Sequence, residues 1–253
     1  MYGEMLDKIS EVAWHKVKLL KESRIKYLIL SMMAGVYVGF GILLIFSIGA
    51  AAGDSPFKKT LMGISFGIAL SLVIMAGGEL FTGNNMIMTV SSLHKKVKWM
   101  DTLKVWFYSY IGNLLGSIVL AGLFVLGGGA KGSVGEFFIS ASQAKMSGDF
   151  FELLFKGILC NMLVCLAIFT SIKLKEETAK LIMIFWCLFA FITSGFEHSV
   201  ANMTILSVGL MSPNGGVLTL SGFWANMIPV TLGNIIGGAV FIGYSYFIVG
   251  KSK

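Results

Sequence analysis

Apolar residues fill long stretches of the chain, and charged residues are mostly confined to the segments between them. Residues 27–53, for example, include no charged side chain. A helix that spans a bilayer needs about 20 mainly apolar residues. The pattern therefore predicts an all-α membrane protein. We expect six transmembrane helices, at 27–51, 60–93, 105–126, 151–172, 181–208 and 223–250.

Two of these predicted helices are interrupted by polar residues, the second at Glu79 and the fifth at Glu197. Between residues 181 and 250, only Glu197 and the adjacent His198 carry a charge or titrate near neutral pH. A charged side chain at bilayer depth costs at least ~2.5 kcal/mol, so its presence indicates a functional site. We expect His198 to act at this site and Glu197 to support it.

The amino-terminal segment, residues 1–26, has a different pattern, in which apolar residues recur at helical spacing with lysines between them. This pattern is typical of an amphipathic helix that lies on the cytoplasmic membrane surface. A helix that docks onto a neighbouring subunit is the alternative. Its apolar positions are Met5, Leu6, Ile9, Val12, Ala13, Val17 and Leu20.

The membrane domain, residues 27–253, repeats itself. Gly-Asn-Leu-Leu-Gly at 112–116 recurs as Gly-Asn-Ile-Ile-Gly at 233–237, an offset of 121 residues. The interruption at 78–86 aligns with 195–203 at an offset of 117, which pairs Thr82 with Ser199. We therefore expect two repeats, at about 27–130 and 150–250. Each holds three helices, and this odd number inverts the second repeat in the membrane.

Two broken helices at equivalent positions of inverted repeats both reach the membrane midplane. The half-helices that begin near Thr82 and Ser199 then direct amide groups and positive dipole ends toward the centre, which favours an anion. An ordinary glycine kink is the alternative for one such break. A matched pair of breaks favours the functional interpretation.

Composition and charge agree with this prediction. Hydrophobic residues make up 56% of the chain, and the formal net charge is +7. Fifteen Lys and Arg residues fall in the terminal segments and in the connections on their side, against four in the alternate connections. This asymmetry places both termini in the cytoplasm and indicates a membrane boundary rather than a nucleic-acid surface.

No cofactor, metal site or enzyme signature is expected. The three cysteines, Cys160, Cys165 and Cys187, lack the spacing of a zinc site, and their odd number argues against a disulfide framework. The three histidines are too dispersed to supply paired haem ligands within one chain.

The segment Gly-Phe-Glu-His-Ser-Val-Ala-Asn-Met at 195–203 resembles the signature of the formate/nitrite transporter family, which also includes hydrosulfide channels. Further segments that resemble this family lie at 79–84, 157–167 and 228–238, so the resemblance extends over nearly the whole chain. It implies an aquaporin-like fold and a homopentamer with one pore in each protomer. It also implies that small monovalent anions of weak acids, such as hydrosulfide, nitrite or formate, cross the inner membrane of a prokaryote.

The resemblance also implies a set of pore residues. His198 and Thr82 match the pore centre, and Lys145 matches a vestibular lysine. The outer constriction matches Phe66, Val164 and Phe191, and the inner one Leu70 and Leu80. Asn161 and Asn234 match pore-lining amides, and Asn202 is a further supporting polar residue.

These residues lead to a mechanistic hypothesis. Lys145 concentrates an anion, the apolar constrictions dehydrate it, and His198 with Thr82 offers a hydrogen bond or a proton. We favour hydrosulfide or nitrite over strict formate specificity. A neutral-solute channel for water or ammonia, a proton-coupled anion symporter and a membrane-embedded redox or assembly subunit remain as alternatives.

Overall fold

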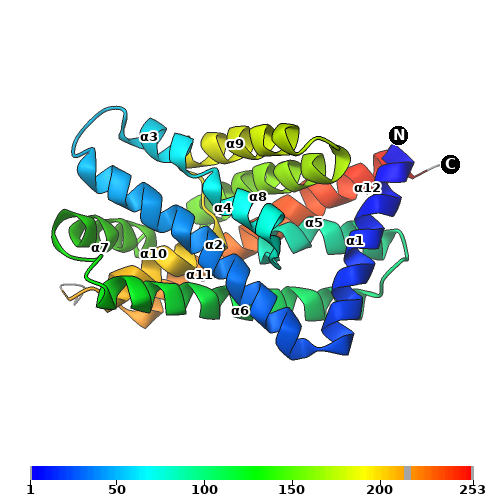
Figure 1. The fold of residues 1–253 in the computed structure, drawn as a ribbon, viewed down its shortest axis with the longest axis horizontal. Helices are drawn as coiled ribbons and strands as arrows, with labels where there is room; N and C mark the ends of the chain where they lie inside the picture. The colour runs from blue at the N-terminus through cyan, green and yellow to red at the C-terminus, as the bar shows by residue number, and fades with distance from the viewer. Residues whose placement is uncertain (1, 214–217, 252–253) are drawn as a thin grey trace.

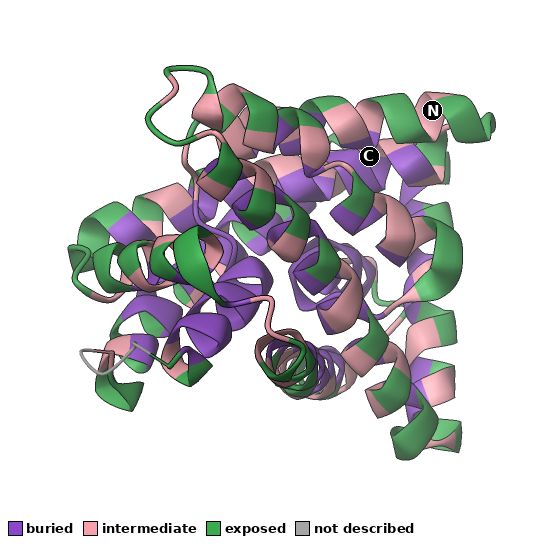
Figure 2. Cartoon of the chain, turned by 60° about the vertical axis from the view of Figure 1, so that its left-hand side comes forward, coloured by how far each residue is buried: buried purple, intermediate pink, exposed green. Residues whose placement is uncertain are grey.

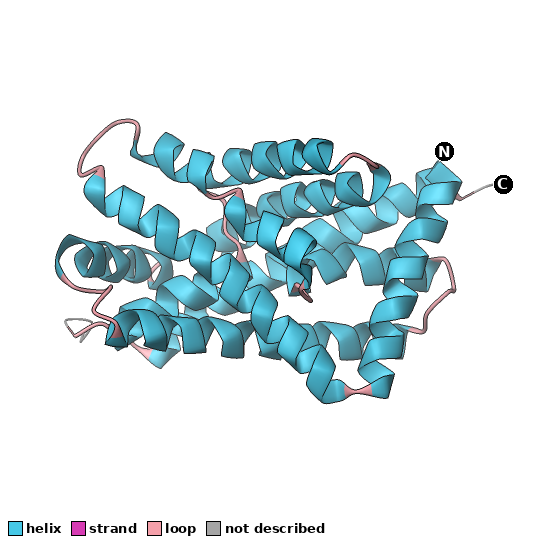
Figure 3. Ribbon diagram, viewed as in Figure 1, coloured by secondary structure: helices cyan, strands magenta, loops and turns pink. Residues whose placement is uncertain are grey.

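The computed structural model describes residues 2–213 and 218–251, and the regular structure of these residues is helical (Figure 3). In chain order the helices are α1 (Tyr2–Glu22), α2 (Arg24–Ala51), α3 (Lys58–Ser65), α4 (Ile68–Leu72), the π-helix η1 (Val73–Gly77), α5 (Phe81–Leu93), α6 (Trp99–Leu126), α7 (Gly132–Met146), α8 (Phe150–Lys173), α9 (Glu177–Thr193), α10 (Ser199–Met211), α11 (Leu220–Ile235), the π-helix η2 (Ile236–Tyr244) and α12 (Ser245–Gly250).

The six predicted passes correspond to these elements. Five segments of the described chain are long and apolar enough to cross a membrane, namely Arg24–Ala51, Lys58–Gly77, Trp99–Leu126, Phe150–Lys173 and Leu220–Gly250. The remaining pass is the broken pair α9 and α10, each too short to span a bilayer alone. The start of α1 and the end of α12 lie at the same end of the bundle (Figure 1).

The two halves pack in the same way. In the first half, Gly35 of α2 lies so close to α6 that an added Cβ would be 2.2 Å from the Asn113 carbonyl oxygen. In the second half, Gly233 of α11 lies equally close to α8, where a Cβ would be 2.2 Å from the Leu154 carbonyl oxygen. A side chain at either glycine would separate the backbones. The same holds for the repeated pair Gly116 and Gly237, where an added Cβ would be 2.0 and 2.3 Å from the Met32 and Ile158 carbonyl oxygens.

The predicted register of the repeat at the breaks is wrong by one residue. Gly77 and Gly195 both have a positive φ, of 82° and 72°. Helices α5 and α10, of 13 residues each, begin at Phe81 and Ser199, so the offset is 118. The sequence permits either register because Gly77–Gly78 and Asn84–Asn85 are doublets. By position, Thr82 is therefore paired with Val200.

The amino-terminal helix was predicted to lie on the membrane surface or against a neighbouring subunit, and its observed packing is different. The apolar face of α1, which includes Met5, Ile9 and Val17, is buried within the chain. It packs mainly against α5 and α12, with further contacts to α2 and α6. Its apolar spacing did predict a buried face, but not the partner that covers it.

Helix α7 was not predicted, because residues 131–149 were assigned to the connection between the repeats. It packs against α2, α10 and α11. The Phe138 ring stacks on Phe46 of α2, with ring centroids 4.2 Å apart. Residues of mixed polarity obscure this 15-residue helix in the sequence. Buried residues gather in the helices inside the bundle (Figure 2), including nearly all of α5 and α10.

Candidate functional site

His198 lies where the second broken pass resumes, as the N-cap residue of α10. Its Nδ1 accepts a hydrogen bond from the Ala201 backbone N–H at 3.2 Å. In a neutral imidazole one nitrogen accepts and the other donates, so this bond places the proton on Nε2. Nε2 lies 2.9 Å from Thr82 Oγ1. The two broken passes therefore meet in a hydrogen bond from the His198 ring to the Thr82 hydroxyl oxygen.

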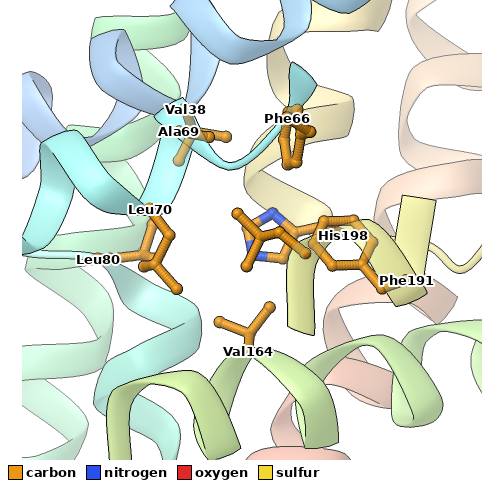
Figure 4. A pocket seen from close by; sticks show the side chains of 9 residues that line it. Val38, Phe66, Ala69, Leu70, Leu80, Val164, Phe191 and His198 are labelled. Carbon is orange, nitrogen blue, oxygen red and sulfur yellow. The ribbon is translucent and has the colours of Figure 1, made fainter. Parts of the chain in front are cut away.

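The His198 ring borders a cavity of about 10 Å³ whose other lining residues are all apolar (Figure 4). This volume is about that needed for one water molecule. The residues expected at both constrictions line this one cavity, namely Phe66, Leu70, Leu80, Val164 and Phe191. Thr82 is fully buried and contacts the cavity wall through His198. An ion with a complete hydration shell does not fit this space.

A larger cavity lies on each side of this centre. We call them the α7-side vestibule, about 200 Å³ and lined in part by Lys145, and the α1-side vestibule, about 380 Å³ and lined in part by Lys16. His198 and Phe191 border both the centre and the α7-side vestibule, and Leu80 borders both the centre and the α1-side vestibule. Each vestibule thus shares lining residues with the narrow apolar centre.

The vestibular lysine Lys145 is held by a carboxylate. Its Nζ lies 2.7 Å from both carboxylate oxygens of Glu197, and Asn202 Nδ2 donates to Glu197 Oε2 at 2.6 Å. The side chains of Lys145 and Glu197 are only 19% and 10% exposed. This pairing cancels much of the charge that was expected to attract an anion. The Glu197 carboxylate is thus held by Lys145 and Asn202.

The α1-side vestibule holds an equivalent cluster. Lys16 Nζ lies 2.8 Å from both carboxylate oxygens of Glu79. The Tyr27 hydroxyl donates to Glu79 Oε2 at 2.7 Å, and Asn84 Nδ2 lies 3.3 Å from the same oxygen. Glu79 and Asn84 precede Glu197 and Asn202 by 118 residues each, as the repeat requires. A carboxylate–lysine pair therefore borders each vestibule.

Two asparagines fix the backbones of the breaks. Asn113 Oδ1 accepts from the Phe81 N–H at 2.9 Å, and its Nδ2 donates to the carbonyl oxygens of Ser31 and Glu79. Asn234 repeats this arrangement on the other side. Its Oδ1 accepts from the Ser199 N–H at 2.8 Å, and its Nδ2 donates to the carbonyl oxygens of Gly157 and Glu197.

The expectation that Asn161 and Asn234 line the pore is corrected by these contacts. Both side chains are fully buried, and neither borders the three cavities described above. Asn161 Nδ2 donates to the carbonyl oxygens of Asn234 and Thr82 at 2.6 and 3.1 Å. Unpaired carbonyl oxygens at a helix break are costly in an apolar interior, so each amide stabilises the scaffold instead.

The sequence did not predict three of the residues that line the vestibules. Glu79 was identified only as an interruption, although its repeat partner Glu197 offered the signal. Lys16 lies 63 residues from Glu79 in the sequence, on a helix outside the repeat, so no spacing connects the two. Lys59 also lines the α7-side vestibule and has no acidic group within 4 Å among the described residues.

The part of the chain that the structure describes holds no group of three His, Cys, Asp or Glu side chains that could bind a metal ion.

Known proteins resemble this chain over almost its whole length. A profile described as formate/nitrite transporter matches residues 3–248. The nitrite transporter NirC of Salmonella typhimurium is 40% identical over 248 residues, which cover 98% of this chain and 91% of the relative.

Two solved structures are similar as well. An FNT family ion channel has a TM-score of 0.92 at 39% identity, over 97% of this chain and 98% of the other. A pentameric formate channel with formate bound has a TM-score of 0.80 at 30% identity, over 90% and 98%. These matches confirm the predicted all-helical, aquaporin-like membrane fold, and the relatives are transporters and channels rather than enzymes. The chain therefore belongs to the formate/nitrite transporter family.

Proposed function

We propose that this protein passes small monovalent anions of weak acids across the membrane, with nitrite as its preferred substrate. The observation that carries this proposal is the narrow apolar centre, where His198 is the only polar lining residue, between two lysine-bearing vestibules. The greater identity to a nitrite transporter, 40% against 30% for a formate channel, supports nitrite over formate. Hydrosulfide is the third candidate substrate.

The narrow centre selects by dehydration. Removing the water shell of an ion costs several kcal/mol even after the protein relaxes. A weak acid lowers this cost by crossing in its neutral form, and a hydrogen-bond donor at the narrowest point offsets part of what remains. Anions of strong acids are not protonated under these conditions and cannot cross in a neutral form, so we expect them to pass more slowly.

The geometry favours a hydrogen-bond role for His198 over a proton-donor role. A second proton on the ring would have to reside on Nδ1, where it would remove the hydrogen bond that Nδ1 accepts from Ala201. The ring in its neutral form already directs Nε2–H toward Thr82 and the centre. An anion that displaces the Thr82 oxygen accepts this hydrogen bond, and the proton that neutralises the anion then comes from the solvent.

The deciding experiment is uptake into proteoliposomes under an imposed pH gradient, with nitrite, formate and hydrosulfide each supplied separately. His198→Asn keeps a side-chain acceptor for the N-cap and an N–H donor, whereas His198→Leu keeps neither. We expect the Asn variant to retain the pH profile of the wild-type protein and the Leu variant to lose at least tenfold in nitrite flux. A flattened pH profile in an Asn variant of normal flux would instead assign proton transfer to His198.

The same measurement separates the rival functions. A channel for neutral water or ammonia would show no anion uptake in any arm. Accumulation of the anion in proportion to the imposed pH difference would show that it crosses together with a proton, either as the neutral acid proposed here or by symport. Uptake that follows the membrane potential instead would show that the bare anion passes. Equal initial rates for formate and nitrite would contradict the nitrite preference while leaving the anion pathway intact.

We further infer that the protein is a homopentamer in the inner membrane, with one pore in each protomer and both termini in the cytoplasm. The pentameric state of the similar formate channel supports the assembly. The excess of lysine and arginine on the terminal side supports the orientation. Native mass spectrometry tests the assembly, with an expected mass of five 27.4 kDa chains.

A further inference from the structure

A basic groove of about 600 Å³ lies apart from the pore, between the end of α1 and the connection from α5 to α6. Five lysines and two acidic residues line it, so its formal charge is +3. The lysines are Lys18, Lys21, Lys95, Lys96 and Lys98. None of these side chains borders the two vestibules or the centre, so the groove has no part in the proposed conduction path.

Ion pairs within the chain account for only some of this charge. Lys21 Nζ lies 3.1 Å from Asp101, and Lys18 Nζ lies 3.9 Å from Glu22. Over the described ranges, Lys95 and Lys98 have no carboxylate within 4 Å. Both are exposed on the groove. Their like charges repel each other and no ion pair within the described chain offsets this repulsion, so an anionic ligand would lower it.

Lys95 also has a backbone conformation that suits glycine better. Its φ is 60°, the only positive φ of a non-glycine residue in the described parts of the chain. The Lys95 and Lys96 N–H groups donate to the carbonyl oxygens of Ser92 and Ser91, so Lys95 occupies the left-handed position that closes helix α5. Glycine has no Cβ penalty there, whereas lysine does. The strain is explained if this lysine binds a ligand.

The groove lies beside the start of a helix that is long and apolar enough to span a membrane. Helix α6, a predicted span, starts at Trp99 directly after Lys98. The exposed apolar side chains Trp99, Leu103 and Phe107 follow at helical spacing along α6. Trp14, which is half exposed, also lines the groove. Tryptophan is common at the headgroup level of membranes, and an apolar helix face beside it suits acyl chains.

We propose that this basic groove binds the phosphate-bearing headgroup of an anionic membrane lipid, whose acyl chains lie along the exposed face of α6. The lysine charge complements the phosphate. The adjoining apolar face distinguishes a lipid from a soluble anion, which has no use for it. Basic pockets beside membrane helices bind anionic headgroups in this way. The α6 N-terminus, whose N-cap residue Lys98 makes no side-chain cap, adds a positive dipole end to the groove.

Native mass spectrometry of the full-length protein, titrated with phosphatidylglycerol or phosphatidylcholine, tests this assignment. The informative variant is Lys95→Gly/Lys98→Gln, because Gly suits the left-handed backbone at residue 95 and should keep the melting temperature at or above that of the wild-type protein. The matched control is Lys173→Gln/Lys175→Gln, which removes the same charge from exposed lysines in and just after the last turn of α8.

We expect phosphatidylglycerol to bind the groove variant at least fivefold more weakly than the wild-type protein, since each lysine near an anionic surface contributes about a fivefold change. Phosphatidylcholine binding and the control variant should stay unchanged. Equal phosphatidylglycerol affinity in the groove variant and the wild-type protein would overturn the proposal. So would displacement of the lipid by soluble glycerol phosphate at equal concentration, because the acyl chains would then contribute nothing.

Discussion

The two breaks in the membrane passes share a scaffold but differ at the pore. At each break a glycine with positive φ ends one helix, and an asparagine from a distant helix binds the freed backbone. A carboxylate two residues after the glycine binds a lysine. The residue after that carboxylate is the N-cap of the next half-helix, which is Leu80 in the first repeat and His198 in the second. The halves diverge where the chemistry lies.

This divergence shows how an inverted repeat produces an asymmetric site. Leu80 and His198 occupy equivalent positions and both line the central cavity. The Thr82 hydroxyl is the hydrogen-bonding partner of His198. The equivalent residue in the second repeat is Val200, which has no polar side-chain atom. The duplicated contacts place two half-helices end to end, and one polar residue from each half then makes the centre. The scaffold contacts follow the symmetry of the repeat, whereas the residues at the pore centre differ between the two halves.

The two vestibular lysines make the same contacts in both halves, although they come from helices that are not related by the repeat. Lys16 comes from α1, which precedes the first repeat, and Lys145 comes from the end of α7. Both ammonium groups contact both oxygens of their carboxylate at 2.8 and 2.7 Å. Two unrelated helices thus neutralise equivalent buried carboxylates.

The largest expected effect comes from breaking these lysine contacts. Lys16→Met and Lys145→Met each leave a desolvated carboxylate without its cation. Removing one partner of a buried ion pair costs about 3–5 kcal/mol of folding free energy. We expect a similar loss of thermal stability in detergent for both variants, together with loss of nitrite uptake, because an unpaired carboxylate then faces the entering anion.

The control for this pair is Lys59→Met, which removes an exposed vestibular lysine without an acidic neighbour among the described residues. It should leave thermal stability unchanged and lower uptake only at low salt, where steering by surface charge operates. Adding Glu79→Gln to Lys16→Met, or Glu197→Gln to Lys145→Met, should restore most of the stability. Stability losses no greater than that of Lys59→Met would show that the pairs are not structural.

The next effect concerns the two asparagines. Asn113→Ala and Asn234→Ala each remove one acceptor and two donor bonds to backbone groups of a break. With about 1 kcal/mol for each hydrogen bond, the expected cost is about 3 kcal/mol in either half. Equal losses of thermal stability would establish that the two scaffolds are energetically equivalent. A loss in one half alone would show that the repeat is retained in shape but not in energy.

The sequence predicted most of this scaffold but not how its parts meet. Hydropathy located the spans, since a bilayer tolerates only helices with satisfied backbones. Glu197 and His198 identified the second break because charged or titratable side chains are costly at bilayer depth. The register of the repeat was wrong because glycine and asparagine doublets align in two ways, and only positive φ angles and hydrogen bonds distinguish them.

The sequence could not predict which distant segments contact each other, and the physical reason is different. The apolar spacing of α1 predicts one buried face, but this spacing is the same whether the face lies on lipid, on another subunit or on the same chain. The site residue Lys16 was therefore missed. Asn161 was placed in the pore by resemblance, although its amide bonds to the backbone of Thr82 and Asn234. An amide near a pore serves either role, and only the direction of its side chain decides.

The smallest and most specific effect comes from making the centre symmetric. Thr82→Val installs the residue that the second repeat has at the equivalent position, Val200, so α5 should accept its shape. It deprives the His198 Nε2–H of its acceptor, which costs about 1 kcal/mol. We expect a small fall in thermal stability and about a fivefold lower nitrite flux, because the ring is no longer held toward the passage. Thr82→Ser keeps the hydroxyl and should retain most of the flux. If Val and Ser variants conduct equally, the Thr82 hydroxyl does not position His198, and the ring is held by its Ala201 contact alone.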